Sequence, residues 1–230
     1  MKLCIALINR KPGTGKTTSA VFLAHAFAER GPVLLVDADP AASALEWSDL
    51  AADEGGFPFR IVGLPSKQLH QRVPEIALPD EVVVIDSPQI EDHAAIAGSI
   101  MRLADELVVT CAPTGIEINR TTPIRNEIEK YDAARVIPVR VCVLLNRAVQ
   151  GTNSLKNARS ILTDDLKFDV LGTTIFRSEV YAQGFGTRPL AASADPWRAV
   201  ARELLDRAGM ATAEDRAWLA EVRAARQGRP

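Results

Sequence analysis

The amino-acid sequence predicts an α/β fold: a single domain with a mostly parallel central β-sheet flanked by helices on both faces. Apolar runs of strand length alternate with longer helical stretches along the 230 residues. These runs are continuously apolar rather than alternating, which is typical of parallel strands buried on both faces. No repeat, low-complexity segment or linker divides the chain. We therefore expect one domain, residues 1–210, followed by a C-terminal helix and tail, residues 211–230.

The first half of the chain sets the alternating pattern. The run LCIALI at residues 3–8 predicts a buried strand, and the helix expected at 17–30 ends at Gly31-Pro32, a strong stop signal. A strand is expected at 33–36 and a helix at 43–52. A weaker strand at 59–62 precedes a helix at 66–76, which places Leu69, Val73 and Ile76 on one face. A strong strand follows at 82–85 and a helix at 92–104.

The second half continues this pattern with weaker signals near its end. Strands are expected at 107–111 and 139–145, with a helix at 119–132 between them. A helix at 155–166 leads to a short strand at 173–176. The helix at 196–208 is expected to begin with Pro196 in its first turn. A largely polar helix at 213–226 ends the chain.

Composition indicates an ordinary globular protein, with 47% hydrophobic and 24% charged residues. The three cysteines, Cys4, Cys111 and Cys142, lie in or beside apolar runs, which predicts buried thiols in a reducing compartment. No run approaches the roughly 18 apolar residues of a membrane span, so we expect a cytoplasmic protein. Residues 1–118 carry a net charge of −7 and residues 119–230 a net charge of +5, which hints that the second half meets a polyanion.

A phosphate-binding loop follows the first strand: NRKPGTGKTT, residues 9–18, leads directly into a helix. Its glycines let backbone amides turn toward phosphate oxygens, and the helix amino terminus adds partial positive charge. Lys16 can reach the β- and γ-phosphates, and the Thr17 hydroxyl can ligate Mg²⁺. Arg10 stands where G-x-x-x-x-G-K-T has its first glycine. The predicted nucleotide contacts are Lys11, Pro12, Gly13, Thr14, Gly15, Lys16, Thr17 and Thr18.

The arrangement K-x-G-x-G-K-T-T at residues 11–18 resembles the deviant Walker A motif of the ParA/MinD ATPases, with the small ParA/ParF-type partition ATPases the most similar branch. The resemblance implies a P-loop NTPase fold, ATP and Mg²⁺ as cofactors, and a homodimer that forms on ATP. In that family the lysine matched by Lys11 crosses to the partner's nucleotide, where a cation offsets charge on the transferring phosphoryl group. Pro12 stands where the family has a glycine.

Two further segments resemble the acidic motifs of this family. VLLVDADP, residues 33–40, resembles the D-x-D-P-Q motif, which implies that Asp39 positions or activates the attacking water and that Asp37 lies near the metal. VVVIDSP, residues 82–88, resembles a Walker B strand, and Asp86 at its end is expected to hold Mg²⁺, through water or Thr17.

The nucleoside contacts are expected from two later segments. Asn146, followed by Arg147, resembles the family's adenine-reading asparagine, whose amide matches the donor and acceptor of the base edge. A strand-end asparagine also forms turns, so that alternative stays open. In residues 174–190, Phe176 stands where the family has a base-packing proline, and Arg177 matches an arginine near the nucleotide and DNA-binding surface.

The resemblance implies a DNA-partition ATPase that is nucleoid-associated. It would bind nonspecific DNA as an ATP dimer and hydrolyse ATP when a ParB-like or other small DNA-binding adaptor stimulates it. The candidate DNA contacts are Arg177, Arg188, Arg198, Arg202 and Arg207. One alternative is a MinD-like or other cargo-positioning ATPase. Membrane binding is not expected, because the C-terminal helix is nearly neutral with a small apolar face. Another is a nucleotide-gated scaffold with little hydrolysis, suggested by Pro12.

Overall fold

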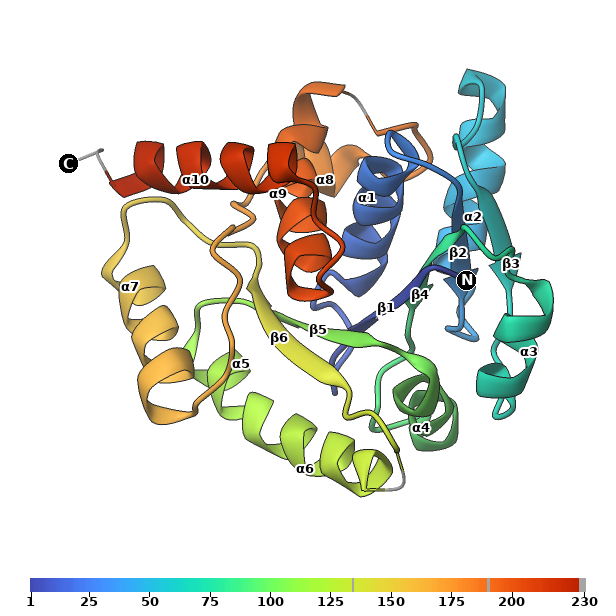
Figure 1. Ribbon diagram of the computed structural model, residues 1–230, viewed down its shortest axis with the longest axis horizontal. Helices are drawn as coiled ribbons and strands as arrows, with labels where there is room; N and C mark the ends of the chain where they lie inside the picture. The colour runs from blue at the N-terminus through green and yellow to red at the C-terminus, as the bar shows by residue number, and fades with distance from the viewer. Residues whose placement is uncertain (134, 190, 228–230) are drawn as a thin grey trace.

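The computed structural model describes residues 1–133, 135–189 and 191–227. In the described chain a single six-stranded sheet of parallel strands has the order β3-β2-β4-β1-β5-β6 (Figure 1). The strands are β1 (Leu3–Ile8), β2 (Val33–Asp37), β3 (Arg60–Gly63), β4 (Val82–Asp86), β5 (Glu106–Cys111) and β6 (Arg140–Leu145). This arrangement confirms the predicted fold class.

Helices cover both faces of the sheet (Figure 1). One face packs on α1 (Lys16–Ala28), α2 (Ser43–Leu50) and α9 (Ala191–Arg207). The other packs on α3 (Leu69–Ile76), α4 (Ala94–Leu103), α6 (Thr121–Asp132) and α7 (Asn153–Ser160). Shorter helical turns are η1 (Ala51–Glu54), α5 (Gly115–Asn119), η2 (Ile161–Asp165) and α8 (Glu179–Gln183), and α10 (Ala213–Gln227) follows α9.

Strand β1 shows why the apolar runs are continuous. Leu3, Ile5 and Leu7 belong to the core on the α1 side, and the alternate residues Cys4 and Ala6 belong to the core on the α4 side. Because successive side chains of a strand point to opposite faces, both sets must be apolar when both faces are covered.

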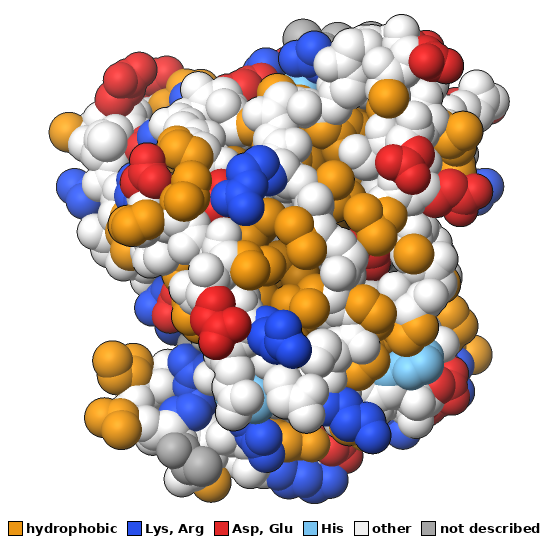
Figure 2. Space-filling model, turned by 90° about the vertical axis from the view of Figure 1, so that its right-hand side faces the viewer, with side chains coloured by type: hydrophobic (Ala, Val, Ile, Leu, Met, Phe, Trp, Pro, Cys, Tyr) orange, Lys and Arg blue, Asp and Glu red, His pale blue; other side chains and the backbone are white. Residues whose placement is uncertain are grey.

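The sheet edge at β3 is the weakest part of the architecture. Its four residues are only partly buried or exposed, whereas β2 beside it is fully buried. Figure 2 shows the side of the molecule that carries α2, β3 and α3: hydrophobic side chains gather across its middle, with Lys and Arg side chains toward its lower edge. The strand with the weakest sequence signal is therefore the one with the least cover.

The predicted strand at 173–176 is wrong. The described structure has there an isolated bridge between Ala148 and Phe176, beside the end of β6. Upstream, the amide of Gly172 donates to the Glu203 carboxylate at 2.6 Å and that of Thr173 at 2.8 Å. A side chain from α9 thus takes donors that a strand ladder would use.

Several helix predictions also need correction. Helix α9 begins at Ala191, so Pro196 lies inside it rather than in the first turn. The stretch AASAD at 191–195 extends the helix, since alanine is the strongest helix former. The helix predicted at 155–166 consists of α7 and a π-helical turn, η2. The short helices α5 and α8 were not predicted, and the other helices differ from prediction only at their ends.

The C-terminal helix α10 is attached to the body by a buried acid. Asp215 is 1% exposed, and its carboxylate accepts hydrogen bonds from Arg30 at 2.6 Å and from Arg202 at 3.1 Å. Leu219 is buried, and the Arg202 guanidinium lies 4.3 Å from the Trp218 ring centroid. The side chains of Arg223 and Arg226 lie outside the described part. Within that part, no helix has the length and apolar character needed to cross a bilayer.

Candidate nucleotide site

The phosphate loop lies at the carboxyl end of β1, where α1 begins. Gly13 and Gly15 have positive φ values of 69° and 84°, a backbone conformation that residues with a Cβ rarely adopt. A Cβ on Gly15 would also lie 2.7 Å from Nδ2 of Asn146. Both glycines are therefore required by the shape of the loop, as its sequence predicts.

Polar side chains fasten this loop to the sheet. Asn9 donates from Nδ2 to the carbonyl of Thr110 at 2.7 Å, and its Oδ1 accepts from the Lys11 amide at 3.2 Å. The Thr14 hydroxyl is buried and accepts from Oγ1 of Thr110 at 3.2 Å. Thr14 can thus offer a ligand its backbone amide, while its side chain faces the sheet.

Lys16 is held at the base of the loop. Its side chain is buried, and Nζ donates to the Lys11 carbonyl at 3.2 Å. Burial lowers the pKa of Lys16, and the carboxylates of Asp86 and Asp39 oppose that change. The buried Lys16 ammonium therefore donates to a neutral backbone carbonyl. A charged phosphate oxygen would form a stronger hydrogen bond with it.

A cavity of about 480 Å³ opens in front of Lys16. It brings together most of the predicted phosphate and catalytic residues with several that the sequence did not single out. Its lining is Pro12, Gly13, Gly15, Lys16, Thr17, Thr18, Asp39, Ala41, Ser43, Gln89 and His93. Ala41 stands where the D-x-D-P-Q motif has glutamine.

Asp86, at the end of β4, is fully buried, and neither carboxylate oxygen has a hydrogen-bond partner within the described chain. Burial raises the pKa of Asp86 to about 7; Asp37 and Asp39 add to the rise, and the neighbouring Thr17 hydroxyl and Lys16 ammonium oppose it. Unpaired buried carboxylate oxygens beside a hydroxyl form a donor set that fits Mg²⁺, which prefers oxygen ligands.

The two aspartates of the second motif differ in their surroundings. Asp37 pairs in register with Asp86 across β2 and β4, but its carboxylate accepts the amides of Asp39, Ala44 and Leu45 at 2.9–3.1 Å. The bonds from Ala44 and Leu45 cap the start of α2. Asp39 is partly exposed and lines the phosphate cavity. Of these two aspartates, Asp39 is the one that lines the phosphate cavity, and its Oδ1 accepts the Ala41 amide at 3.0 Å.

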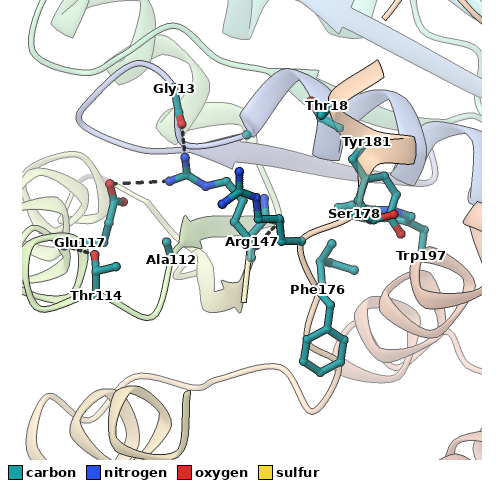
Figure 3. Close-up of a pocket in the computed structure, with 15 residues that line it drawn as sticks. Gly13, Thr18, Ala112, Thr114, Glu117, Arg147, Phe176, Ser178, Tyr181 and Trp197 are labelled. Atoms are coloured by element: carbon teal, nitrogen blue, oxygen red, sulfur yellow. Dashed lines mark hydrogen bonds and ion pairs between the residues drawn. The ribbon is translucent and has the colours of Figure 1, made fainter. Parts of the chain in front are cut away.

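A second cavity, of about 780 Å³, adjoins the first beyond the loop (Figure 3). It is lined by Gly13, Gly15, Thr18, Ala112, Thr114, Glu117, Asn146, Arg147, Ile175, Phe176, Arg177, Ser178, Tyr181, Ala182 and Trp197. Asn146 is 5% exposed, and its Nδ2 donates to the Ser19 hydroxyl at 3.3 Å. Its Oδ1 accepts the Arg147 amide at 2.7 Å, so the turn-forming role and a place in the cavity coexist.

Arg147 connects the end of β6 to the phosphate loop. It has a positive φ of 54°, and its Nη1 donates to the Gly13 carbonyl at 2.7 Å. Its Nη2 lies 3.9 Å from Oε1 of Glu117, as the dashed lines in Figure 3 show. Oε2 of Glu117 is buried without a hydrogen-bond partner in the described chain. No motif pointed to Glu117, which comes from the unpredicted helix α5.

Two further predicted residues, Phe176 and Lys11, differ in their relation to the cavities. Phe176 is 39% exposed, and Figure 3 shows its ring pointing away from Thr18 and Tyr181. Lys11 is not among the residues that line the phosphate cavity, and its ammonium pairs with Glu91 of its own chain. Glu91, too, carries no sequence signal.

The arginines proposed to contact DNA divide into two groups. Arg198 pairs with Glu29 and Asp195, Arg202 with Asp215, and Arg207 with Glu106 and Asp169. These three guanidiniums have carboxylate partners in the same chain, and the ion pairs connect helices to the rest of the domain. The other two, Arg177 and Arg188, are exposed.

Comparison with known proteins agrees with this geometry. Residues 5–187 match the family model described as the CobQ/CobB/MinD/ParA nucleotide binding domain. The maintenance of carboxysome distribution protein A of Gloeobacter kilaueensis is 38% identical over 114 residues, which span 50% of this chain and 51% of that protein. The protein of the same name from Halothiobacillus neapolitanus is 26% identical over 178 residues, 77% of this chain and 81% of that protein.

Solved structures share the fold at low sequence identity. Apo McdA from Cyanothece has a TM-score of 0.73 at 15% identity, covering 89% of this chain and 100% of that one. The septum site-determining protein MinD from Pyrococcus horikoshii, complexed with Mg-ADP, has a TM-score of 0.68 at 20% identity, covering 93% and 100%. With the family model matching most of its length, the chain belongs to the CobQ/CobB/MinD/ParA family of nucleotide-binding domains.

Proposed function

We propose that this protein is a Mg²⁺-dependent ATPase that dimerises on ATP and uses the nucleotide cycle to position a cargo in the cell. The observation that carries the proposal is the convergence of Lys16, Thr17 and Asp39 on one cavity, with Asp86 buried and unpaired beside Thr17. A protein that only bound nucleotide would need the loop and the lysine, but not a second carboxylate that lines the same cavity.

The chain's own residues divide the work of hydrolysis. The backbone amides of residues 13–18 and the Lys16 ammonium hold the phosphates, since this segment lines the phosphate cavity at the start of α1. Asp39 orients the attacking water and accepts its proton. Thr17 and Asp86, with Asp37 next to them, would hold Mg²⁺, which neutralises charge on the phosphates. Lys11 of the partner subunit would supply the final cation.

The larger cavity would take the nucleoside. Asn146 lies at its base and Arg147 spans it to the loop, so both can contact an adenosine whose phosphates occupy the loop. The Arg147 guanidinium is planar and can stack on a base while keeping its bond to Gly13. The unpaired Oε2 of Glu117 is an acceptor available to a hydroxyl or amine of the nucleoside.

For the cargo we favour a protein assembly of the carboxysome type over plasmid or chromosomal DNA. Both curated relatives described above are maintenance of carboxysome distribution proteins. Nonspecific nucleoid DNA would serve as the track, and a small adaptor on the cargo would stimulate hydrolysis. Arg177 and Arg188 are the candidate DNA contacts, since both are exposed in the more basic half of the chain. A membrane track is disfavoured, because Leu219 and Trp218 of α10 contact the body.

The proposal is tested by three measurements on the purified protein: dimerisation, DNA binding and turnover. ATP with Mg²⁺ should produce a dimer that binds nonspecific duplex DNA and releases it at high salt. Asp39→Asn should retain ATP-dependent dimerisation and DNA binding while losing turnover. ATP-dependent binding to anionic vesicles in place of DNA would favour the MinD-like alternative. Tight ATP binding with no turnover, even with DNA and adaptor, would favour the scaffold.

The cargo is tested in the host cell. Deleting the gene should make fluorescently labelled protein assemblies cluster, while plasmid retention stays unchanged. Loss of a plasmid with evenly spaced assemblies would instead assign the protein to DNA partition.

A further inference from the structure

The carboxylate of Glu91 binds two cations of the segment that follows β1. Its Oε1 lies 2.9 Å from Nη2 of Arg10, and its Oε2 pairs with Nζ of Lys11. The backbone joins the same segments: the Ile90 amide donates to the Asn9 carbonyl at 3.2 Å, and the Glu91 amide to the Arg10 carbonyl at 3.4 Å. Glu91 is thus placed by the backbone to meet both side chains.

This arrangement keeps Lys11 in its own subunit. The lysine that would reach a partner's nucleotide instead has its ammonium on Glu91, with its side chain 40% exposed. We propose that Glu91 and Arg10 are positioning residues for Lys11: Glu91 holds the ammonium within one subunit, and Arg10, bound to the same carboxylate, favours its release when ATP-bound subunits meet. The inference rests on the proposed function, since it assumes that Lys11 acts across a dimer.

Arg10 makes the release possible at low cost. If Lys11 were the sole partner of Glu91, its departure would leave the Glu91 carboxylate unpaired. With Arg10 on the other oxygen, Glu91 stays paired after Lys11 leaves. Arg10 also repels the Lys11 ammonium, because two cations share one carboxylate. Arg10 stands where the G-x-x-x-x-G-K-T motif has a glycine, and only a side chain at this position can pair with Glu91.

Nucleotide binding would also affect Lys11 through its backbone carbonyl. In the structure Nζ of Lys16 donates to the Lys11 carbonyl at 3.2 Å. Phosphate would draw Lys16 away, because a charge-assisted bond is stronger than a bond to a neutral carbonyl. The backbone of Lys11 then loses the bond at its carbonyl and keeps the one from its amide to Asn9, while its side chain is still held by Glu91. ATP thus prepares the lysine for transfer, and the second subunit completes it.

Two charge-neutralising variants should change dimerisation in opposite directions. Glu91→Gln removes the holding carboxylate, so the dimer should form at lower ATP and its basal turnover should rise. Arg10→Gln removes the competing cation, so the dimer should require more ATP. An exposed ion pair changes an equilibrium by about two- to fivefold. Because a dimer contains two such pairs, its formation constant should change by about four- to twenty-fivefold, and because two ATP bind per dimer, the ATP midpoint should shift by about two- to fivefold. Sedimentation velocity at a series of ATP concentrations measures it.

Glu75→Gln and Arg72→Gln provide matched controls, since these exposed residues of α3 lose the same charges elsewhere. Both should leave the midpoint unchanged. If Glu91→Gln and Arg10→Gln both weaken the dimer, the cluster is only structural and the inference is wrong. Circular dichroism melting confirms that each variant is folded.

A Lys11→Gln background separates this inference from the proposed function. There, Glu91→Gln should no longer shift the midpoint, because no ammonium remains to be held. An equal shift with and without Lys11 would overturn the holding role. If Lys11→Gln alone leaves dimerisation and turnover at wild-type values, the proposed action of Lys11 across the dimer fails, whatever the Glu91 variants do.

Discussion

The phosphate end and the nucleoside end of this site are built in different ways. At the phosphate end, two glycines with positive φ and a helix amino terminus set the geometry, and the side chains of Lys16 and Asp86 are buried. At the nucleoside end, side chains from the turn after β6, from α5 and from α8 with the segment before it form the walls, and Phe176 and Arg177 are exposed. One end is a backbone structure; the other is an assembly of side chains.

The difference matters for both recognition and adaptation. Backbone amides at a helix terminus bind any phosphate chain, so the phosphate end should tolerate little change and discriminate little between nucleotides. The side-chain walls can be altered one residue at a time without disturbing the sheet. Substitutions at the phosphate end should therefore weaken ATP binding more than substitutions at the nucleoside end.

Lys16→Ala should weaken ATP binding by about 100-fold or more, because truncating one partner of a buried charged contact also strands the other. Fluorescent-nucleotide titration measures the loss, and Lys67→Ala, an exposed lysine, serves as the control. A loss below about fivefold would mean that the loop amides alone hold the phosphates.

Asp86→Asn should abolish Mg²⁺-dependent turnover and yet stabilise the apo protein above pH 7. Burial raises the pKa of Asp86 from 3.8 to about 7, so the folded chain retains a proton that the unfolded chain releases between those values. Wild-type stability from this group therefore falls as pH rises through that window. The free energy of unfolding of Asp86→Asn, relative to wild type, should rise by up to about 1.4 kcal/mol per pH unit.

Urea denaturation at pH 5, 6, 7 and 8, without nucleotide or Mg²⁺, measures this difference. Comparing variant with wild type cancels contributions from the other titrating groups. Parallel stability profiles across the range would show that Asp86 has an ordinary pKa, and its buried carboxylate would then need a partner that the structure does not give it.

Arg147→Ala should weaken ATP binding by about tenfold, since it removes the guanidinium that joins Gly13 to the nucleoside cavity. Arg147→Gly should lose the same affinity but fold more stably than Arg147→Ala by about 1 kcal/mol, because glycine adopts φ 54° without strain. Titration and urea denaturation measure the two effects. If Arg147→Gly binds ATP like wild type, the guanidinium has no part in the site.

Phe176→Ala should have the smallest effect, below about twofold in ATP affinity, because the ring is 39% exposed and points away from Thr18. Adenosine competition against fluorescent ATP is the appropriate measurement. A loss above tenfold would show that the ring rotates onto the base when nucleotide binds, as the sequence resemblance implied.

The contrast between the two ends also explains what the sequence could predict. Gly15 and Asp86 were predictable because the loop conformation requires a glycine and because Asp86 ends a buried strand. Glu117 and Glu91 were not, since each meets its partner only through the three-dimensional arrangement of loops distant in sequence. The strand predicted at 173–176 failed for a related reason: Glu203, about 30 residues later, takes the amides of Gly172 and Thr173.

The pairing of β2 with β4 restricts insertions and deletions in strand β4. In β4 all five residues are buried, and the four before Asp86 are valines or isoleucine, so sliding the strand by one position would cost few apolar contacts. Yet Asp37 and Asp86 face each other only in the present register. A one-residue insertion or deletion in β4 could therefore yield a folded protein with its acid turned to the wrong face. Chemistry, rather than folding, restricts length variation in this strand.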